Sequence, residues 1–138
     1  MAHWPSEGSV LLNQTRWGNP HVEAGPPPMA LSTGDFLFVF NSWAWRSEAL
    51  GASPVYEPAW AILDKDDPTH VLAEATQPLT QPSAAPWMEG VPPYTCNVPR
   101  VAFVEAMHAT DQKDEFRIFL GGADAVVGTA LVRVTGLA

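Results

Sequence analysis

The chain has 138 residues, of which 46% are apolar, a share typical of a folded domain rather than a disordered chain. Only 16% of the residues are charged, and 15 acidic residues against 7 Lys and Arg give a formal net charge of −8. Such a surface repels polyanions, so we expect neither nucleic acid nor an anionic membrane as a partner. The apolar runs are too short to cross a bilayer, and residues 1–10 lack the features of a secretory signal, which predicts a cytoplasmic protein.

Fourteen prolines and ten glycines interrupt the chain. Because Pro removes a backbone donor and fixes φ, long helices are disfavoured, and the sequence predicts an all-β fold with almost no helix. Seven short segments rich in β-branched, aromatic and aliphatic residues are the expected strands: 28–31, 36–40, 59–63, 71–75, 101–106, 116–120 and 126–134. Segments 43–55 and 77–95 are expected to be long surface connections.

A weak internal repeat relates the two halves of this strand pattern. Residues 25–42 can be laid on residues 97–122, since each unit has an entry strand, a turn and a bulky strand that ends in small or polar residues. Four strands followed by three are typical of two adjacent β-propeller blades, the second of them incomplete. A seven-stranded sandwich with an accidental repeat fits the strand count equally well.

Metal and cofactor chemistry has little support in the sequence. The single cysteine, Cys96, allows no internal disulfide, and His3, His21, His70 and His108 lack the spacing of metal ligands. No phosphate-cradling glycine-rich motif is present. We therefore expect no metal and no cofactor.

Five strings in one order carry a resemblance to a known family: HVEAGPPP (21–28), LSTGDFLFVFNSW (31–43), YEPAWAILDKDDPTHVL (56–72), NVPRVAF (97–103) and FLGGADAVVGTALVRV (119–134). Over roughly residues 16–135 the chain resembles the C-terminal part of glycoside hydrolase family 130. The resemblance implies a five-bladed β-propeller that acts on β-mannosides, as an inverting phosphorylase or, in some branches, as a hydrolase. It supports the propeller reading of the strand pattern.

With this resemblance the chain divides into four parts. Residues 1–20 are an irregular lead-in, 21–76 form a first propeller-like blade, 77–96 a Pro-rich connection, and 97–138 a second, incomplete blade. About two blades leave sheet faces and edges uncovered. We therefore expect the chain to associate with itself or with a partner chain that completes the propeller.

The resemblance implies that Asp124 contacts the sugar and that Tyr56 lies on the substrate side. Asp124 follows Gly121 and Gly122, and two glycines at a strand end let the backbone approach a ligand closely. An ionised carboxylate suits acceptance of hydrogen bonds from sugar hydroxyls. A plain turn for Asp124 and a half-buried strand-edge ring for Tyr56 are the alternatives.

The phosphate side of the family pattern is less faithful in this chain. Asn41 stands where phosphorylases of the family usually have a phosphate-binding His, and His21 where a Lys is common. An amide carries no charge and an imidazole is only partly cationic at neutral pH, so both changes weaken a phosphate site. Glu23, beside His21, is a candidate base toward water or an exposed loop carboxylate. Inorganic phosphate remains a possible co-substrate.

The family's general acid is an Asp of an early blade, and this chain has no counterpart of it. No catalytic residue is therefore assigned. We expect a carbohydrate-active protein that acts on β-mannosides by inverting phosphorolysis or hydrolysis once the missing blades are supplied. The alternative is a non-catalytic sugar-binding or structural module derived from that fold.

Overall fold

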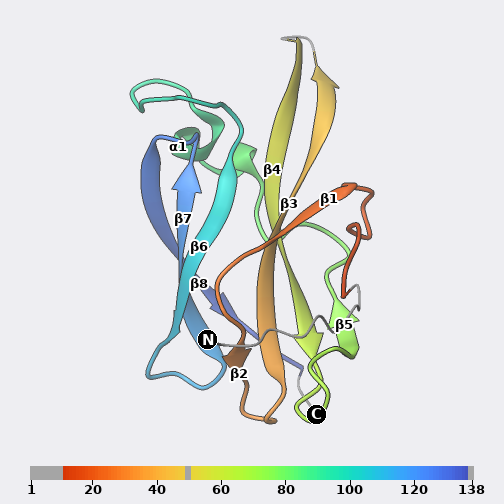
Figure 1. The fold of residues 1–138 in the computed structure, drawn as a ribbon. Coiled ribbons are helices and arrows are strands. Elements are labelled where there is room, and N and C mark those ends of the chain that lie inside the picture. Colours follow the sequence, from red (N-terminus) through yellow and green to blue (C-terminus); the bar gives the residue numbers. More distant parts are fainter. Residues whose placement is uncertain (1–10, 49–50, 137–138) are drawn as a thin grey trace, which may run out of the picture.

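The computed structural model describes residues 11–48 and 51–136 and consists of two antiparallel sheets joined by a long connection (Figure 1). The first sheet contains β1 (His21–Ala24), β2 (Met29–Ala30), β3 (Phe36–Glu48), β4 (Gly51–Leu63) and β5 (Val71–Glu74). The second contains β6 (Ala102–Ala109), β7 (Glu115–Gly122) and β8 (Val126–Arg133). Helical structure in the described part is limited to η1 (Pro82–Ala84) and α1 (Pro86–Glu89), so the expectation of an all-β fold is confirmed.

The first sheet has the order β1-β3-β4-β5, and β2 also pairs with β3. It thus holds five strands where four were expected, because β1 adds a strand at His21–Ala24. Three of the four residues of β1 are exposed, so no alternation of apolar and polar residues marks this strand in the sequence.

The segment 43–55 is not a surface loop, which corrects the expectation from the sequence. β3 runs on to Glu48 and pairs with β4 along its whole length. Pro54 and Pro58 lie within β4. β5 pairs with β4 only from Ala61 to Leu63. No strand therefore lies beside Pro54 and Pro58 on that side of β4, and the N–H groups that these prolines lack are not needed there.

The second sheet has three strands, as expected, in the order β6-β7-β8. A β-bulge interrupts the register between Val104 and Ala106, which leaves Glu105 without a partner on β7. α1 packs against this sheet through Trp87, which lies directly on the backbone at Gly122 and Gly128.

The main core lies between the two sheets, which face each other as adjacent propeller blades do. It is formed by buried aliphatic and aromatic residues of both sheets and the connection: Leu31, Leu37, Val39, Ile62, Met88, Ala102, Val104, Phe116, Ile118 and Leu120. A second, smaller cluster on the other side of the first sheet is covered by Leu11, Leu12 and Trp17. Among the described residues, no helix is long and apolar enough to cross a membrane.

Candidate functional site

A cavity of about 450 Å³ lies where β4 of the first sheet meets β6 and the end of β7. We call it the inter-sheet cleft and define it by its lining residues: Glu23, Pro54, Tyr56, Val98, Val101, Phe103, Glu105, Gly121 and Asp124. Three residues predicted from the sequence, Glu23, Tyr56 and Asp124, are therefore brought together from β1, β4 and the β7–β8 turn.

Tyr56 is held at the centre of an aromatic row. Its ring centroid lies 5.8 Å from that of Trp43 on β3 and 5.9 Å from that of Phe103 on β6. Its backbone N–H donates to the carbonyl of Arg100 at 3.0 Å. Burial raises the pKa of the Tyr56 phenol, and the carboxylates of Glu23 and Asp124 raise it further. The phenol therefore stays neutral and can donate a hydrogen bond into the cleft.

Asp124 lies in the tight turn between β7 and β8. Ala123 and Asp124 have φ values of 48° and 53°, the left-handed pair found in type I′ hairpin turns. Asn97 anchors this turn, because its side-chain amide donates to the Asp124 carbonyl at 2.8 Å. No donor among the described residues binds the Asp124 carboxylate, so it is free to accept hydrogen bonds from a ligand.

The two glycines before this turn have different roles. A Cβ at Gly122 would lie 2.2 Å from Cε3 of Trp87, so Gly122 makes room for Trp87 and not for a ligand. A Cβ at Gly121 would meet only the Phe103 carbonyl oxygen, at 3.9 Å, and Gly121 lines the cleft. The expectation that both glycines allow a ligand to approach is therefore wrong for Gly122.

His21 and Glu23 lie on β1 rather than in a loop. The His21 ring stacks on Trp43, with centroids 3.9 Å apart and planes within 3°. The Trp43 indole N–H donates to Oε1 of Glu23 at 2.9 Å. Trp43 thus orients both residues, but only Glu23 lines the cleft.

Asn41 lies outside the cleft, fully buried between the sheets. Its side-chain amide donates to the Val104 carbonyl at 3.0 Å, and its Oδ1 accepts from the Val104 N–H at 2.7 Å. The amide nitrogen and the amide oxygen of Asn41 both bond to Val104, and Asn41 does not line the inter-sheet cleft. The position predicted to lie on the phosphate side instead joins the two sheets.

Glu105 is a cleft residue that the sequence analysis missed. The β-bulge at Glu105 breaks the alternation of β6, so the pattern of apolar and polar residues gave no sign of its direction. With Glu23 and Asp124 it gives the cleft three carboxylates, and no Lys, Arg or His is found among the described residues that line it. The described residues nevertheless contain no group of three or more side chains that could hold a metal ion.

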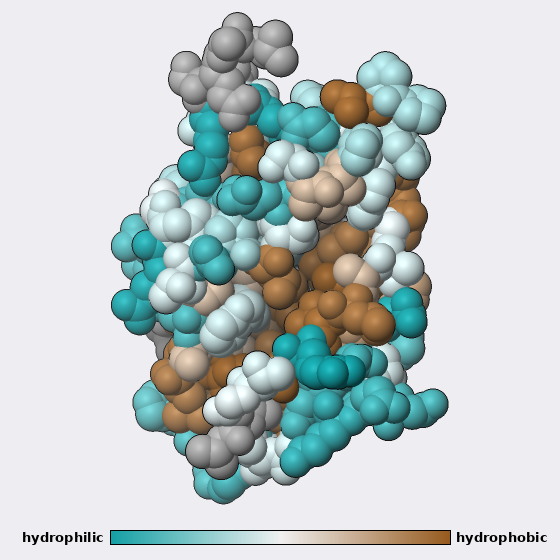
Figure 2. Space-filling model, turned by 180° about the vertical axis from the view of Figure 1, so that it is seen from behind, coloured by the Kyte–Doolittle hydropathy of each residue, from teal (hydrophilic) through white to brown (hydrophobic). Residues whose placement is uncertain are grey.

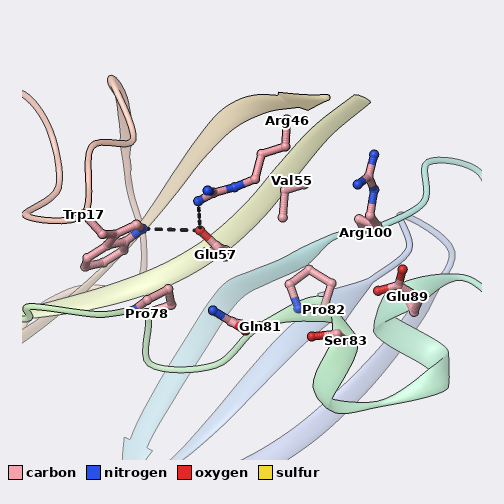
Figure 3. Close-up of a pocket in the computed structure, with 10 residues that line it drawn as sticks. All are labelled: Trp17, Arg46, Val55, Glu57, Pro78, Gln81, Pro82, Ser83, Glu89 and Arg100. Atoms are coloured by element: carbon pink, nitrogen blue, oxygen red, sulfur yellow. Dashed lines mark hydrogen bonds and ion pairs between the residues drawn. The ribbon is translucent and has the colours of Figure 1, made fainter. Parts of the chain in front are cut away.

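A second cavity, of about 440 Å³, lies beside β4 next to Val55 and Glu57 (Figure 3). Glu57 is buried there, and its Oε2 accepts from Arg46 at 3.0 Å, from Asn19 at 3.1 Å and from Trp17 at 3.3 Å. At the other end Arg100 donates to the Ser53 hydroxyl. Arg46 and Glu57 pair with each other in this second cavity, and none of the residues predicted from the sequence lines it.

The chain is similar to enzymes that act on mannosides. It is 28% identical over 118 residues to a 1,2-beta-oligomannan phosphorylase from Thermoanaerobacter sp. (strain X514). The matched region covers 86% of this chain and 34% of the phosphorylase. No family model matches the chain. The resemblance to glycoside hydrolase family 130 is thus confirmed with a curated relative, and the chain spans about a third of that relative's length.

Solved structures show the same fold. One of them comes from work on glycoside hydrolases of family 130 that target beta-1,2 mannosidic linkages in Candida mannan. The match covers 88% of this chain and 32% of that protein's chain, with a TM-score of 0.59 and 23% sequence identity. A glycosyl hydrolase from Bacteroides ovatus matches 81% of this chain and 29% of its own, with a TM-score of 0.57 and 23% identity. The two sheets therefore form a partial propeller-like fold.

Proposed function

We propose that the inter-sheet cleft is part of the binding site for a β-mannoside, and that the chain supplies one wall of the active site of a mannoside-degrading enzyme. The observation that carries this proposal is the meeting of Glu23, Tyr56 and Asp124 in one cavity, in a chain similar to a mannoside phosphorylase. A neutral phenol and carboxylate oxygens are suited to bind sugar hydroxyls, and the rings of Tyr56 and Phe103 offer apolar surfaces to the C–H groups of a sugar.

The charge of the cleft favours water over phosphate as the acceptor. Glu23, Glu105 and Asp124 are all acidic residues, and the described lining offers no Lys, Arg or His to bind an incoming phosphate. Asn41 adds no support for phosphate, because its amide bonds to Val104 and lies outside the cleft. Glu23 is the candidate general base toward water, oriented by the Trp43 indole.

Catalysis requires a further part that this chain does not supply. An inverting enzyme needs a general acid on the leaving oxygen, opposite the attacking water. The chain corresponds to about a third of the phosphorylase, so we assign the acid to blades carried by additional polypeptide, in cis or in a partner chain. The second candidate function is a non-catalytic sugar-binding module, for which the cleft alone suffices.

Calorimetric titration with β-1,2-mannobiose tests the binding proposal. Asp124→Asn suits this test because Asn tolerates the left-handed φ of 53°, keeps the size of the side chain, and removes its charge and one acceptor oxygen. Loss of a hydrogen bond to a charged group should weaken binding by about 1.5–3 kcal/mol without a change in thermal midpoint. Asp111→Asn, an exposed change outside the cleft, serves as the control. Equal affinities of Asp124→Asn and wild type, or no mannobiose binding at all, would refute the proposal.

A further inference from the structure

Trp45 is a large aromatic side chain that lies mostly outside the core. It lies near the end of β3, and 65% of its surface is exposed. No described residue accepts a hydrogen bond from its indole N–H. An exposed indole that contacts a row of rings leading into a cleft offers a ligand a flat apolar face.

Trp45 continues the aromatic row that enters the inter-sheet cleft. Its ring meets that of Trp43 edge to face, with centroids 6.4 Å apart. Trp43 in turn stacks with Tyr56, which lines the cleft. The row of rings thus runs without a break from Phe103 inside the cleft to Trp45 outside it.

The register of the β3–β4 hairpin places these side chains on one face. Trp43 pairs with Tyr56 and Trp45 pairs with Pro54, and directly opposed residues of antiparallel strands project to the same side of the sheet. Pro54 and Tyr56 both line the cleft. Trp45 therefore borders the cleft on the hairpin, which projects beyond β1 (Figure 1).

We propose that Trp45 and Pro54 form an additional subsite, which binds a sugar residue of an oligosaccharide beyond the residues held in the inter-sheet cleft. This inference rests on the proposed function, since it assigns the cleft a saccharide and adds to it a preference for longer chains. A sugar offers one face of C–H groups to an indole ring, while its hydroxyls reach the free indole N–H or water. The paired strands of the hairpin hold the ring in place before the ligand binds, which lowers the entropic cost of binding.

The dependence of affinity on chain length tests the subsite. β-1,2-Mannobiose and β-1,2-mannotetraose are titrated by calorimetry into wild type, Trp45→Ala and Tyr94→Ala. Tyr94 is also an exposed ring, but it lies in the connection between the sheets and does not line the cleft, so its variant is the matched control. Thermal unfolding of each variant verifies the fold, and an exposed side chain should leave the midpoint unchanged.

Wild type should bind the tetraose more tightly than the biose. Trp45→Ala should weaken tetraose binding by roughly three- to tenfold, the scale of one aromatic contact, and leave biose binding unchanged. Tyr94→Ala should alter neither. A tetraose advantage that persists in Trp45→Ala, or no advantage in wild type, overturns the subsite while the proposed function stands. Failure of wild type to bind either sugar refutes both.

Discussion

Asn41 joins the two sheets through its side chain alone. Its amide makes two hydrogen bonds to the backbone of Val104, which is itself fully buried. Removal of this amide leaves a buried N–H and a buried carbonyl without partners. This position therefore affects the stability of the inter-sheet contact rather than ligand affinity.

Asn41→Ala should lower the free energy of unfolding by about 2–4 kcal/mol, because each unsatisfied buried group costs about 1–3 kcal/mol. Urea titration of the wild type and the variant measures this change. Asn13→Ala, at an exposed position, is the control and should change stability by less than about 0.5 kcal/mol. A stability loss no larger than that of the control would contradict the role we assign to Asn41.

Asp114 connects the sheets at the opposite end. Its carboxylate accepts from the Ser32 N–H at 2.7 Å and from the Ser32 hydroxyl at 2.6 Å. The hydroxyl hydrogen bond lowers the pKa of Asp114 most, and the backbone hydrogen bond lowers it further. Because the pKa of Asp114 is lower in the folded than in the unfolded state, its ionised carboxylate stabilises the fold at pH values above the unfolded-state pKa. This stabilisation is lost as the pH falls through the folded-state pKa of Asp114.

Acidification below about pH 4 should therefore reduce stability, and Asp114→Asn should flatten that part of the pH profile. Asn is suitable because Asp114 has a φ of 54°, which Asn tolerates. Urea midpoints between pH 2 and 7 measure both effects. If the wild type and Asp114→Asn lose stability in parallel, the Ser32 contact does not couple folding to protonation.

At the scale of elements, α1 packs closely on the second sheet because two glycines of that sheet leave room for its Trp87 ring. Trp87 lies over Gly122 on β7 and Gly128 on β8, where added Cβ atoms would lie within 2.3 Å of its ring carbons. The neighbouring Gly121 has no such restriction. This difference provides a matched pair of variants.

Gly122→Ala should destabilise the protein by about 1–3 kcal/mol, since Trp87 has to move away from the sheet. Gly121→Ala should change stability little, because its Cβ meets only an ordinary contact at 3.9 Å. Differential scanning calorimetry of the two variants makes the comparison. Similar midpoints for both would show that Trp87 does not pack as described.

The sequence predicted most strands because they bury one face. β7 alternates between half-buried and buried residues along its whole length, a period of two that is visible in the chain. β1 was missed because it is mostly exposed, and the outer part of the β3–β4 hairpin was missed because Pro54 and Pro58 resemble turn residues. Tertiary context decides both cases.

For the inter-sheet cleft, the family resemblance pointed to Tyr56 and Asp124, which come from different sheets. Tyr56 and Asp124 are far apart in the sequence, and only the resemblance linked them before the structure placed them in one cleft. The contact of Asn41 with Val104 could not be predicted, because a buried amide that bonds to a backbone looks in the sequence like any polar residue at a strand end. Glu105 was missed because a bulge changes the direction of a side chain without a sequence signal.

At the scale of the whole molecule, the second sheet ends in an open edge. β8 pairs only with β7 among the described strands, and Val127 and Leu131 are large exposed residues on it. From behind, apolar side chains gather across the middle of the molecule (Figure 2). A cavity of about 340 Å³, lined by Trp60, Ile62 and Val132 among others, lies between the sheets. Open edges and apolar surface promote association.

We expect the isolated chain to form dimers or larger species at micromolar concentration. A lysine on an edge strand opposes further strand pairing, so Val127→Lys should shift the protein toward the monomer. Val91→Lys is the control, because Val91 is an equally apolar, exposed residue that lies in the connection between the sheets and not on an edge strand. Multi-angle light scattering distinguishes the species. A wild-type monomer that unfolds cooperatively would contradict this expectation.

The central claim is that the inter-sheet cleft binds a β-mannoside, and chemical-shift mapping tests it most directly. In ¹⁵N-labelled protein titrated with β-1,2-mannobiose, the amides of Tyr56, Phe103, Gly121 and Asp124 and the indole N–H of Trp43 should shift together and saturate with one affinity. Shifts confined to the second cavity, at Trp17 and Glu57, or no saturable shift at all, would contradict the account.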